Sequence, residues 1–192
     1  MMRAILIGIL VLMAGGIGWL TFDWYQTRYG GEPFGEPFEL VDQKGTAVTE
    51  AAFRGHPSAV FFGFTHCPEV CPTTLVELDS WLDKLGDEGR DIKVYFVSID
   101  PERDTPEILD AYVSNVSDRI IGLTGEPDKV AAMAKSFGIY ARKVELDDGD
   151  YTMDHTASVL LLDPRGDFFG TIAYEEDGDT AVAKLKRLAA QG

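Results

Sequence analysis

The two cysteines of the chain, Cys67 and Cys71, are the residues best suited to chemistry. An apolar run over 58–64 precedes them, and a segment whose leucines recur every three or four residues follows. We therefore expect both thiols where a buried strand ends and a helix begins. Free N–H groups and the dipole at a helix N-terminus stabilise anions, so a thiolate is favoured there.

The four-residue spacing allows metal binding, thiol–disulfide exchange, or both. If the helix begins by Pro68, the two cysteines lie on one helical face with their Cβ atoms roughly 5–6 Å apart. That separation lets two thiolates share a metal ion and is close to what a disulfide needs. The alternative is a pair of buried cysteines or a static disulfide, although so small a loop would stabilise the fold little.

Among the three histidines, His155 is the one that we expect beside the thiols. It precedes an apolar strand over 157–162, and in a thioredoxin-like layout the loop before that strand lies against the cysteine pair. We expect His66 to point away from the thiols and His56 to be solvated in a loop. His155 could also be an ordinary surface or core histidine.

Two thiolates and one imidazole form a soft, three-coordinate set that suits copper or zinc. A structural zinc ion takes four ligands, and no fourth is evident. A catalytic zinc ion with a bound water is an alternative, with Glu69 as the nearby acid or base. Because we also expect this dithiol to be redox-active and exported, as argued below from the N-terminal segment, copper fits the set better than zinc.

Two carboxylates are candidates for supporting this site. Asp100 ends the strand next to the cysteine strand and could face the site, and Asp154 adjoins His155 and could orient its imidazole. Either could equally be a turn former or a cap. Asp104 is expected to belong to the start of the following helix.

Strand and helix signals alternate along the rest of the chain. We expect a hairpin over 38–49, a strand over 58–64, a helix ending at Gly86, a strand over 92–99, helices from 106 and 127, a strand over 139–144, an acidic loop over 145–150, a hairpin over 157–174 and a helix over 180–190. This order predicts an α/β thioredoxin-like fold, a central mixed sheet flanked by helices, with an N-terminal β-hairpin. The Cys-x-x-x-Cys spacing favours metal binding over fast disulfide exchange.

The first 22 residues are predicted to be a transmembrane anchor. Residues 4–22 carry no charge and span about 28 Å as a helix, close to the thickness of a hydrocarbon core. Arg3 before the span predicts that the rest of the chain is exported. Residues 23–35 are predicted to be a linker and residues 36–192 the copper-binding domain. A cleaved signal peptide is the alternative.

The composition, 45% hydrophobic and 26% charged over 192 residues, suits one globular domain with a sizeable core. The net charge of −15 argues against a nucleic-acid partner. It favours basic partners or a cationic cargo.

Several segments resemble, in the same order, the signature blocks of the Sco/SenC family. The first block, over 62–75, holds both cysteines and is highly specific. The others lie at 98–106, 123–125, 154–158 and 162–166. The resemblance runs from about Phe34 to the C-terminus.

This resemblance implies a membrane-anchored, thioredoxin-fold copper protein that helps to assemble the binuclear copper centre of cytochrome c oxidase. It implies that Cys67, Cys71 and His155 bind copper. The expected partners are the copper-bearing oxidase subunit and other copper carriers or thiol reductants. The expected location is the bacterial inner membrane, with the domain in the periplasm. Two other functions stay open: a thiol–disulfide reductase that keeps the oxidase cysteines reduced, and a peroxidase or redox sensor.

Overall fold

The computed structural model describes residues 8, 12–22, 33–147 and 149–192. The chain divides into two compact units, Met1–Glu32 and Pro33–Gly192. In the first unit, residues 12–22 are helical. Residues 1–7 and 9–11 of the predicted anchor over 1–22, and residues 23–32 of the predicted linker over 23–35, lie outside the described residues. Among those that are described, no helix has the length and apolar character needed to cross a bilayer.

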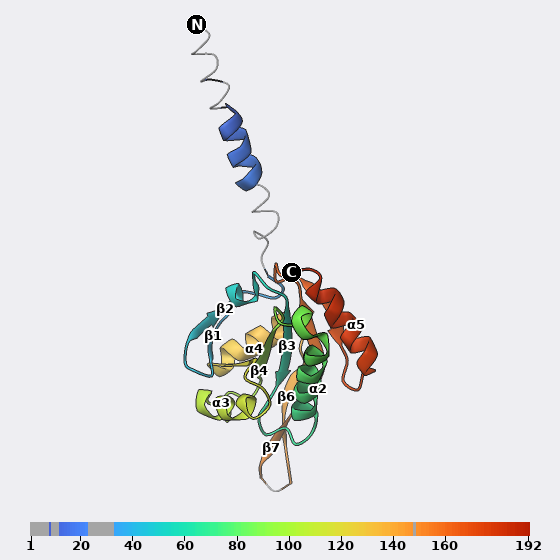
Figure 1. Cartoon of the computed structure of the whole chain (residues 1–192). Helices are drawn as coiled ribbons and strands as arrows, with labels where there is room; N and C mark the ends of the chain where they lie inside the picture. Colours follow the sequence, from blue (N-terminus) through green and yellow to red (C-terminus); the bar gives the residue numbers. More distant parts are fainter. Residues whose placement is uncertain (1–7, 9–11, 23–32, 148) are drawn as a thin grey trace. The chain divides into compact units, whose positions relative to one another are not determined.

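The second unit is built on a seven-stranded sheet (Figure 1). Its strands are β1 (Glu39–Asp42), β2 (Ala47–Thr49), β3 (Ser58–Gly63), β4 (Lys93–Ser98), β5 (Ile120–Thr124), β8 (Val159–Leu162) and β9 (Phe168–Ile172). They follow the spatial order β2-β1-β5-β4-β3-β8-β9. β3, β4 and β5 are parallel, whereas β1 and β8 join them antiparallel. The predicted mixed sheet is therefore confirmed, as are the hairpins β1–β2 and β8–β9.

β3 lies inside the sheet, and all six of its residues are buried. An unbroken apolar run is what a strand needs when both faces of its sheet are covered. Successive side chains point to opposite faces, so Phe61 and Phe62 pack into different layers. Packing on both faces therefore fixes the position of β3, and with it the position at which the segment with Cys67 and Cys71 begins.

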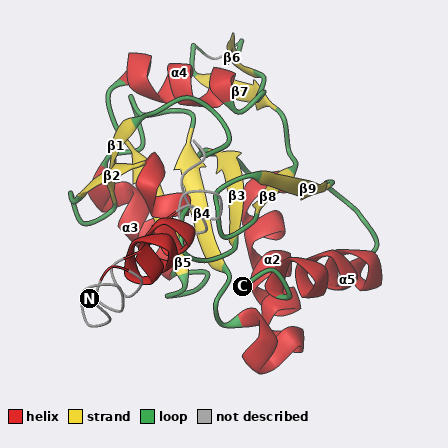
Figure 2. Ribbon diagram, turned by 90° about the horizontal axis from the view of Figure 1, so that it is seen from above, coloured by secondary structure: helices red, strands yellow, loops and turns green. Residues whose placement is uncertain are grey.

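Helices cover both faces of the sheet, with α4 on one side and α2 and α5 on the other (Figure 2). The helices are α2 (Val70–Leu85), α3 (Pro106–Ser114), α4 (Pro127–Ser136) and α5 (Gly178–Ala189), with the short 3₁₀ helices η1 (Glu50–Phe53) and η2 (Gly86–Gly89). Phe62 packs on Phe137 at the end of α4. Phe96, on the opposite face, packs on Tyr112 of α3.

The predicted helix boundaries agree with the local chemistry. Gly86, with a φ of 56°, ends α2 in a conformation that glycine adopts without strain. The Thr105 side chain accepts a hydrogen bond from the N–H of Ile108 at the start of α3, and Pro106 is the first helical residue. These caps fix where the loop between β4 and α3 ends.

A second, two-stranded sheet stands apart from the first. It pairs β6 (Ala141–Glu145) with β7 (Tyr151–His155) in antiparallel register. The strand expected over 139–144 is therefore present, shifted by about two residues. Residues 151–155 were expected to be a loop, and that expectation was wrong. β7 has no buried residue, so it lacks the apolar pattern by which a strand is recognised in sequence.

Candidate metal centre

The two cysteines occupy the turn and the helix that follow β3. α2 begins at Val70, so Cys67 lies in the turn and Cys71 in the first turn of the helix. The expectation that both share one helical face was wrong, because the helix starts after Pro68. The N–H of Cys67 donates to the carbonyl oxygen of Phe64 at 3.2 Å. The N–H of Cys71 donates to Sγ of Cys67 at 3.3 Å, so a free donor of the helix start meets the sulfur.

Gly63, the last residue of β3, makes room for the Cys71 sulfur. A Cβ atom at this position would lie 2.8 Å from Sγ of Cys71 and 2.6 Å from the ring of Phe96. Both contacts are too short for a real side chain. Because glycine stands here, Cys71 packs directly on the sheet and has no exposed surface.

His155, at the end of β7, brings its imidazole to the cysteines. Its Nε2 lies 3.7 Å from Sγ of Cys71. Its ring packs edge-on against Phe61 and Phe64, with centroid distances of 6.3 and 5.8 Å. Nδ1 lies 2.9 Å from the carbonyl oxygen of Thr156, which can only accept, so Nδ1 carries the proton. The lone pair of Nε2 then faces the thiols, the tautomer that a metal ligand needs.

Together these three residues offer one Sγ or ring nitrogen each, all within 4.8 Å of one another. In the described part of the chain, no other group of three histidine, cysteine or acidic side chains comes so close. The set has two soft sulfurs and one imidazole, which fits copper. It lacks the fourth ligand of a closed structural zinc site.

The two thiols differ in exposure and in acidity. The hydrogen bond from Cys71 is the main cause that lowers the pKa of Cys67 to about 4, with backbone N–H groups helping against the effect of burial. The same hydrogen bond and burial raise the pKa of Cys71. Both are free thiols, Cys67 is 9% exposed and Cys71 is fully buried. Cys67 is thus the thiolate and Cys71 its proton donor.

The carboxylates named from the sequence lie around this group without joining it. Asp154 is exposed, and the imidazole N–H donates to the carbonyl oxygen of Thr156 rather than to the Asp154 carboxylate. Asp100 is 3% exposed and accepts hydrogen bonds from the Tyr151 hydroxyl and from Nε of Arg103. It therefore binds the β6–β7 hairpin.

Sequence reasoning missed the role of Asp104, which was assigned to the helix start alone. Asp104 is fully buried and accepts hydrogen bonds from the N–H and hydroxyl of Thr65 at 3.0 and 2.6 Å, and from the Ser98 hydroxyl at 2.6 Å. Parallel neighbouring strands end at the same edge of a sheet. The sequence feature that could have indicated this role is a pair of hydroxyl residues, Thr65 after β3 and Ser98 at the end of β4, whose side chains need a common acceptor.

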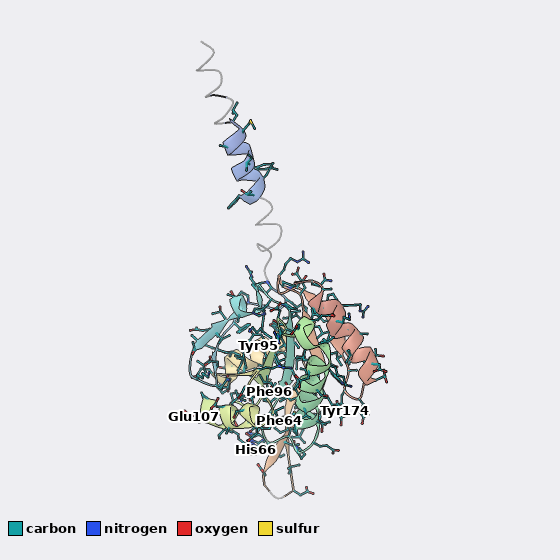
Figure 3. The ribbon with its side chains drawn as sticks, viewed as in Figure 1. Phe64, His66, Tyr95, Phe96, Glu107 and Tyr174 are labelled. Carbon is teal, nitrogen blue, oxygen red and sulfur yellow. The ribbon has the colours of Figure 1, made fainter. Side chains whose placement is uncertain are left out.

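The other two histidines lie away from the thiols. His66 is about half exposed at the sheet end that carries Phe64, and its Nδ1 lies 3.2 Å from the Thr65 hydroxyl (Figure 3). His56 was expected to be solvated, but it is half-buried, stacks on Tyr95 and has its pKa lowered by burial. The apolar ring of Tyr95 explains the difference, because it offers the imidazole a packing surface.

Comparison with known proteins finds a matching family and several relatives of this chain. A model of the family described as SCO1/SenC matches residues 26–190. Protein SCO2, mitochondrial, of Saccharomyces cerevisiae is 37% identical over 162 residues, which cover 82% of this chain and 54% of that protein. The chain spans 46–65% of the length of the first four curated relatives that it matches.

Two similar solved structures hold copper. ScoI of Bradyrhizobium japonicum with copper bound is 43% identical, covers 81% of this chain and 99% of its own, and has a TM-score of 0.74. Yeast Sco1 with copper bound is 34% identical, covers 83% and 90%, and has a TM-score of 0.76. These structures, together with the group formed by Cys67, Cys71 and His155, support the prediction of copper as the metal.

Proposed function

Because the chain belongs to the SCO1/SenC family, we propose that it is a copper carrier in which Cys67, Cys71 and His155 hold the ion. One observation carries the proposal: three ligand atoms from a turn, a helix and a hairpin far apart in sequence lie within 4.8 Å of one another.

The protonation state of the free site suits this cargo. Cys67 is already a thiolate and Nε2 of His155 presents a lone pair, so two of the three ligands need no proton loss. Cys71 must give up its proton when it binds, since its pKa is raised. Copper uptake therefore releases a proton and weakens as the pH falls.

Delivery follows from the same three-ligand arrangement. A three-coordinate ion leaves a position open for an incoming thiolate, and ligands can then be exchanged one at a time. Cys67 is 9% exposed and Cys71 is fully buried, so the acceptor reaches the Cys67 side first. We infer that the acceptor is the copper-bearing subunit of cytochrome c oxidase. A solved relative 26% identical, BsSco, is described as a member of the Sco family of cytochrome c oxidase assembly proteins.

The proposed copper binding is tested by titrating the reduced protein with Cu(I) against a competing chelator. We expect one tight equivalent, weakened on the order of a thousandfold in Cys67→Ser or Cys71→Ser and about a hundredfold in His155→Ala. The matched control is His66→Ala, a histidine beside the same turn without a contact to either sulfur. Affinity that does not change in His155→Ala would remove the imidazole from the site.

A thiol–disulfide reductase is the second candidate, and the asymmetry of the thiols favours it. The Cys67 thiolate would attack one sulfur of an acceptor disulfide, which forms a mixed disulfide with that sulfur and releases the other sulfur as a thiolate. Cys71, after losing its proton, would attack Sγ of Cys67 and release the second thiol, so two electrons pass to the acceptor and Cys67–Cys71 becomes oxidised. Reductase turnover that persists in His155→Ala while copper binding is lost would separate this activity from the carrier.

We also propose that residues 1–22 anchor the protein in a bacterial inner membrane, with the domain in the periplasm. The uncharged run over 4–22 behind Arg3 supports this. The test is alkaline extraction of membranes combined with protease treatment of spheroplasts. A chain that is released by alkaline extraction, or that is protected from the protease, would contradict the anchor or its orientation.

A further inference from the structure

The loop between β4 and α3 carries none of the three ligands, yet it contacts both segments that do. We call residues 100–104 the bridge loop. Its two outer residues, Asp100 and Asp104, are 3% and 0% exposed. Carboxylates are almost never this buried unless they are paired. Their partners therefore show what the loop does.

On the thiol side, Asp104 holds the turn that leads to Cys67. Its carboxylate accepts from the backbone N–H of Thr65 at 3.0 Å and from the Thr65 hydroxyl at 2.6 Å. Thr65 stands two residues before Cys67, whose own N–H bonds back to Phe64. The position of the Cys67 sulfur is thus tied to the Asp104 carboxylate through one short piece of backbone.

On the hairpin side, the loop holds the residue that begins β7. The Tyr151 hydroxyl donates to Asp100 at 2.8 Å, and Nη1 of Arg103 donates to the Tyr151 carbonyl at 3.0 Å. The Arg103 guanidinium also lies 3.7 Å from the centre of the Tyr151 ring. Burial and the Asp100 carboxylate raise the pKa of Tyr151 to about 12, so its hydroxyl is a donor at neutral pH.

The loop itself is fixed to the main sheet. The N–H of Asp100 donates to the Ser98 hydroxyl at 3.0 Å, and the same hydroxyl donates to Asp104 at 2.6 Å. The N–H of Asp104 donates to the Asp100 carbonyl at 2.9 Å, and the Thr124 hydroxyl donates to the Asp104 carbonyl at 2.9 Å. Hydrogen bonds from Ser98 at the end of β4 and Thr124 at the end of β5 therefore fix the positions of Asp100 and Asp104 relative to each other.

We propose that the bridge loop sets the distance between the thiol pair and the imidazole, with Asp104 and Tyr151 as positioning residues. The ladder of β7 runs to β6, which lies outside the seven-stranded sheet, so side-chain contacts contribute to the alignment of β7 with that sheet. This inference rests on the proposed copper site, but it makes separate predictions for the metal-free protein.

The thiol arm of the test compares Thr65→Ala with Thr65→Ser in the full-length protein. Alanine removes the 2.6 Å hydrogen bond to Asp104, whereas serine keeps the hydroxyl. We expect Thr65→Ala to lower the Cu(I) affinity by about three- to tenfold, and to shift the equilibrium of the Cys67–Cys71 disulfide with glutathione by at least about threefold. Thr65→Ser restores both to within about twofold of the wild type.

The hairpin arm compares Tyr151→Phe with Tyr95→Phe. Each change removes one hydroxyl hydrogen bond of 2.8 Å, to Asp100 and to the Ala52 carbonyl respectively. We expect Tyr151→Phe to lower the Cu(I) affinity by about three- to tenfold with the glutathione equilibrium unchanged. The ring resonances of His155, followed by NMR without copper, should shift in Tyr151→Phe and stay in place in Tyr95→Phe.

The outcomes separate this inference from the proposed function. If the wild type binds no Cu(I), the proposed function fails, while the glutathione equilibrium and the His155 resonances still decide the positioning roles. If Thr65→Ala matches Thr65→Ser in both readouts, or if Tyr151→Phe matches Tyr95→Phe, the bridge loop does not position the site. Thermal unfolding of each variant identifies a change that acts through the fold alone, and such a change counts against the inference.

Discussion

The two halves of the proposed copper site are supported in different ways. The thiols come from the interior, where every residue of β3 is buried and Cys71 has no exposed surface. His155 comes from the β6–β7 hairpin, in which no residue of either strand is buried. Apolar packing on both sides of the sheet holds the first half, whereas the second is held by polar contacts with the bridge loop together with the packing of the His155 ring on Phe61 and Phe64.

This contrast predicts different responses to change. A disturbance near the thiols must act on the packed core, and core changes alter the global free energy of unfolding. A disturbance in the hairpin acts on contacts that contribute roughly 0.5–1.5 kcal/mol each, and such regions open locally without global unfolding. Four predictions follow from this difference.

The largest effect is expected in the thiols themselves. Cys67, with a pKa of about 4, should be almost fully ionised at pH 6, where an ordinary cysteine thiol is ionised to less than about 1%. Its thiolate absorbance should therefore disappear only as the pH falls through about 4. Ultraviolet titration of the reduced protein measures this, with Cys67→Ser as the blank.

The control for this titration is Cys71→Ala, which removes the thiol that donates to Cys67. The hydrogen bond from Cys71 is the main cause of the lowered pKa, so the loss of this donor should move the Cys67 transition to higher pH. A transition near pH 8 in the wild type would contradict the assignment of Cys67 as the thiolate.

The next effect tests the packing beneath the thiols. Gly63→Ala places a methyl group 2.8 Å from Sγ of Cys71 and 2.6 Å from the ring of Phe96. We expect it to lower the free energy of unfolding by about 1–3 kcal/mol, measured by urea denaturation. Gly170→Ala in β9 is the matched control, because nothing lies within 4 Å of its Cβ position. Equal effects of the two changes would show that Cys71 is not packed as tightly as described.

A smaller effect should distinguish the two turns. Gly45, between β1 and β2, and Gly149, in the β6–β7 turn, have φ angles of 78° and 86° with open space around them. Alanine at either position costs roughly 1–2 kcal/mol of backbone strain. We expect Gly45→Ala to lower global stability and Gly149→Ala to speed hydrogen exchange in β6 and β7 alone. Global destabilisation by Gly149→Ala would mean that the hairpin unfolds together with the sheet.

The smallest effect is expected from an exposed ion pair on the hairpin. Lys143 lies 3.0 Å from Glu102, and both side chains are about half exposed. Such pairs contribute little, so Glu102→Gln should change the Cu(I) affinity by less than about twofold. Calorimetric titration beside Tyr151→Phe provides the comparison. A larger loss in Glu102→Gln than in Tyr151→Phe would transfer the positioning role to the exposed pair.

The sequence was informative where burial leaves a pattern. The apolar run over 58–64 predicted β3, and the alternation of strands and helices predicted the mixed sheet. His155 was placed near the cysteines by topology alone, and the structure brings the three side chains together. Their role as copper ligands stays a prediction that the titrations above will test.

Patterns failed where polar residues bind other polar residues. β7 pairs with β6 outside the core, so no apolar alternation marks it. Asp104 precedes Thr105 and Pro106, which mark the start of a helix, and we therefore assigned Asp104 to that helix start. Its hydrogen bonds to Thr65 and Ser98 could not be recognised from the sequence. A contact between residues 39 positions apart has no local signature, so only the folded chain reveals it.

The separate ladder of the β6–β7 hairpin makes the residue that we propose as the third ligand replaceable. A hairpin with its own hydrogen bonds can be lengthened, shortened or replaced while the seven-stranded sheet keeps its packing. The donor at position 155 could then become a thioether, a thiolate or a carboxylate, each with its own metal preference. Mutation can therefore change the choice of metal at the hairpin while the hydrogen bonds of the seven-stranded sheet are kept.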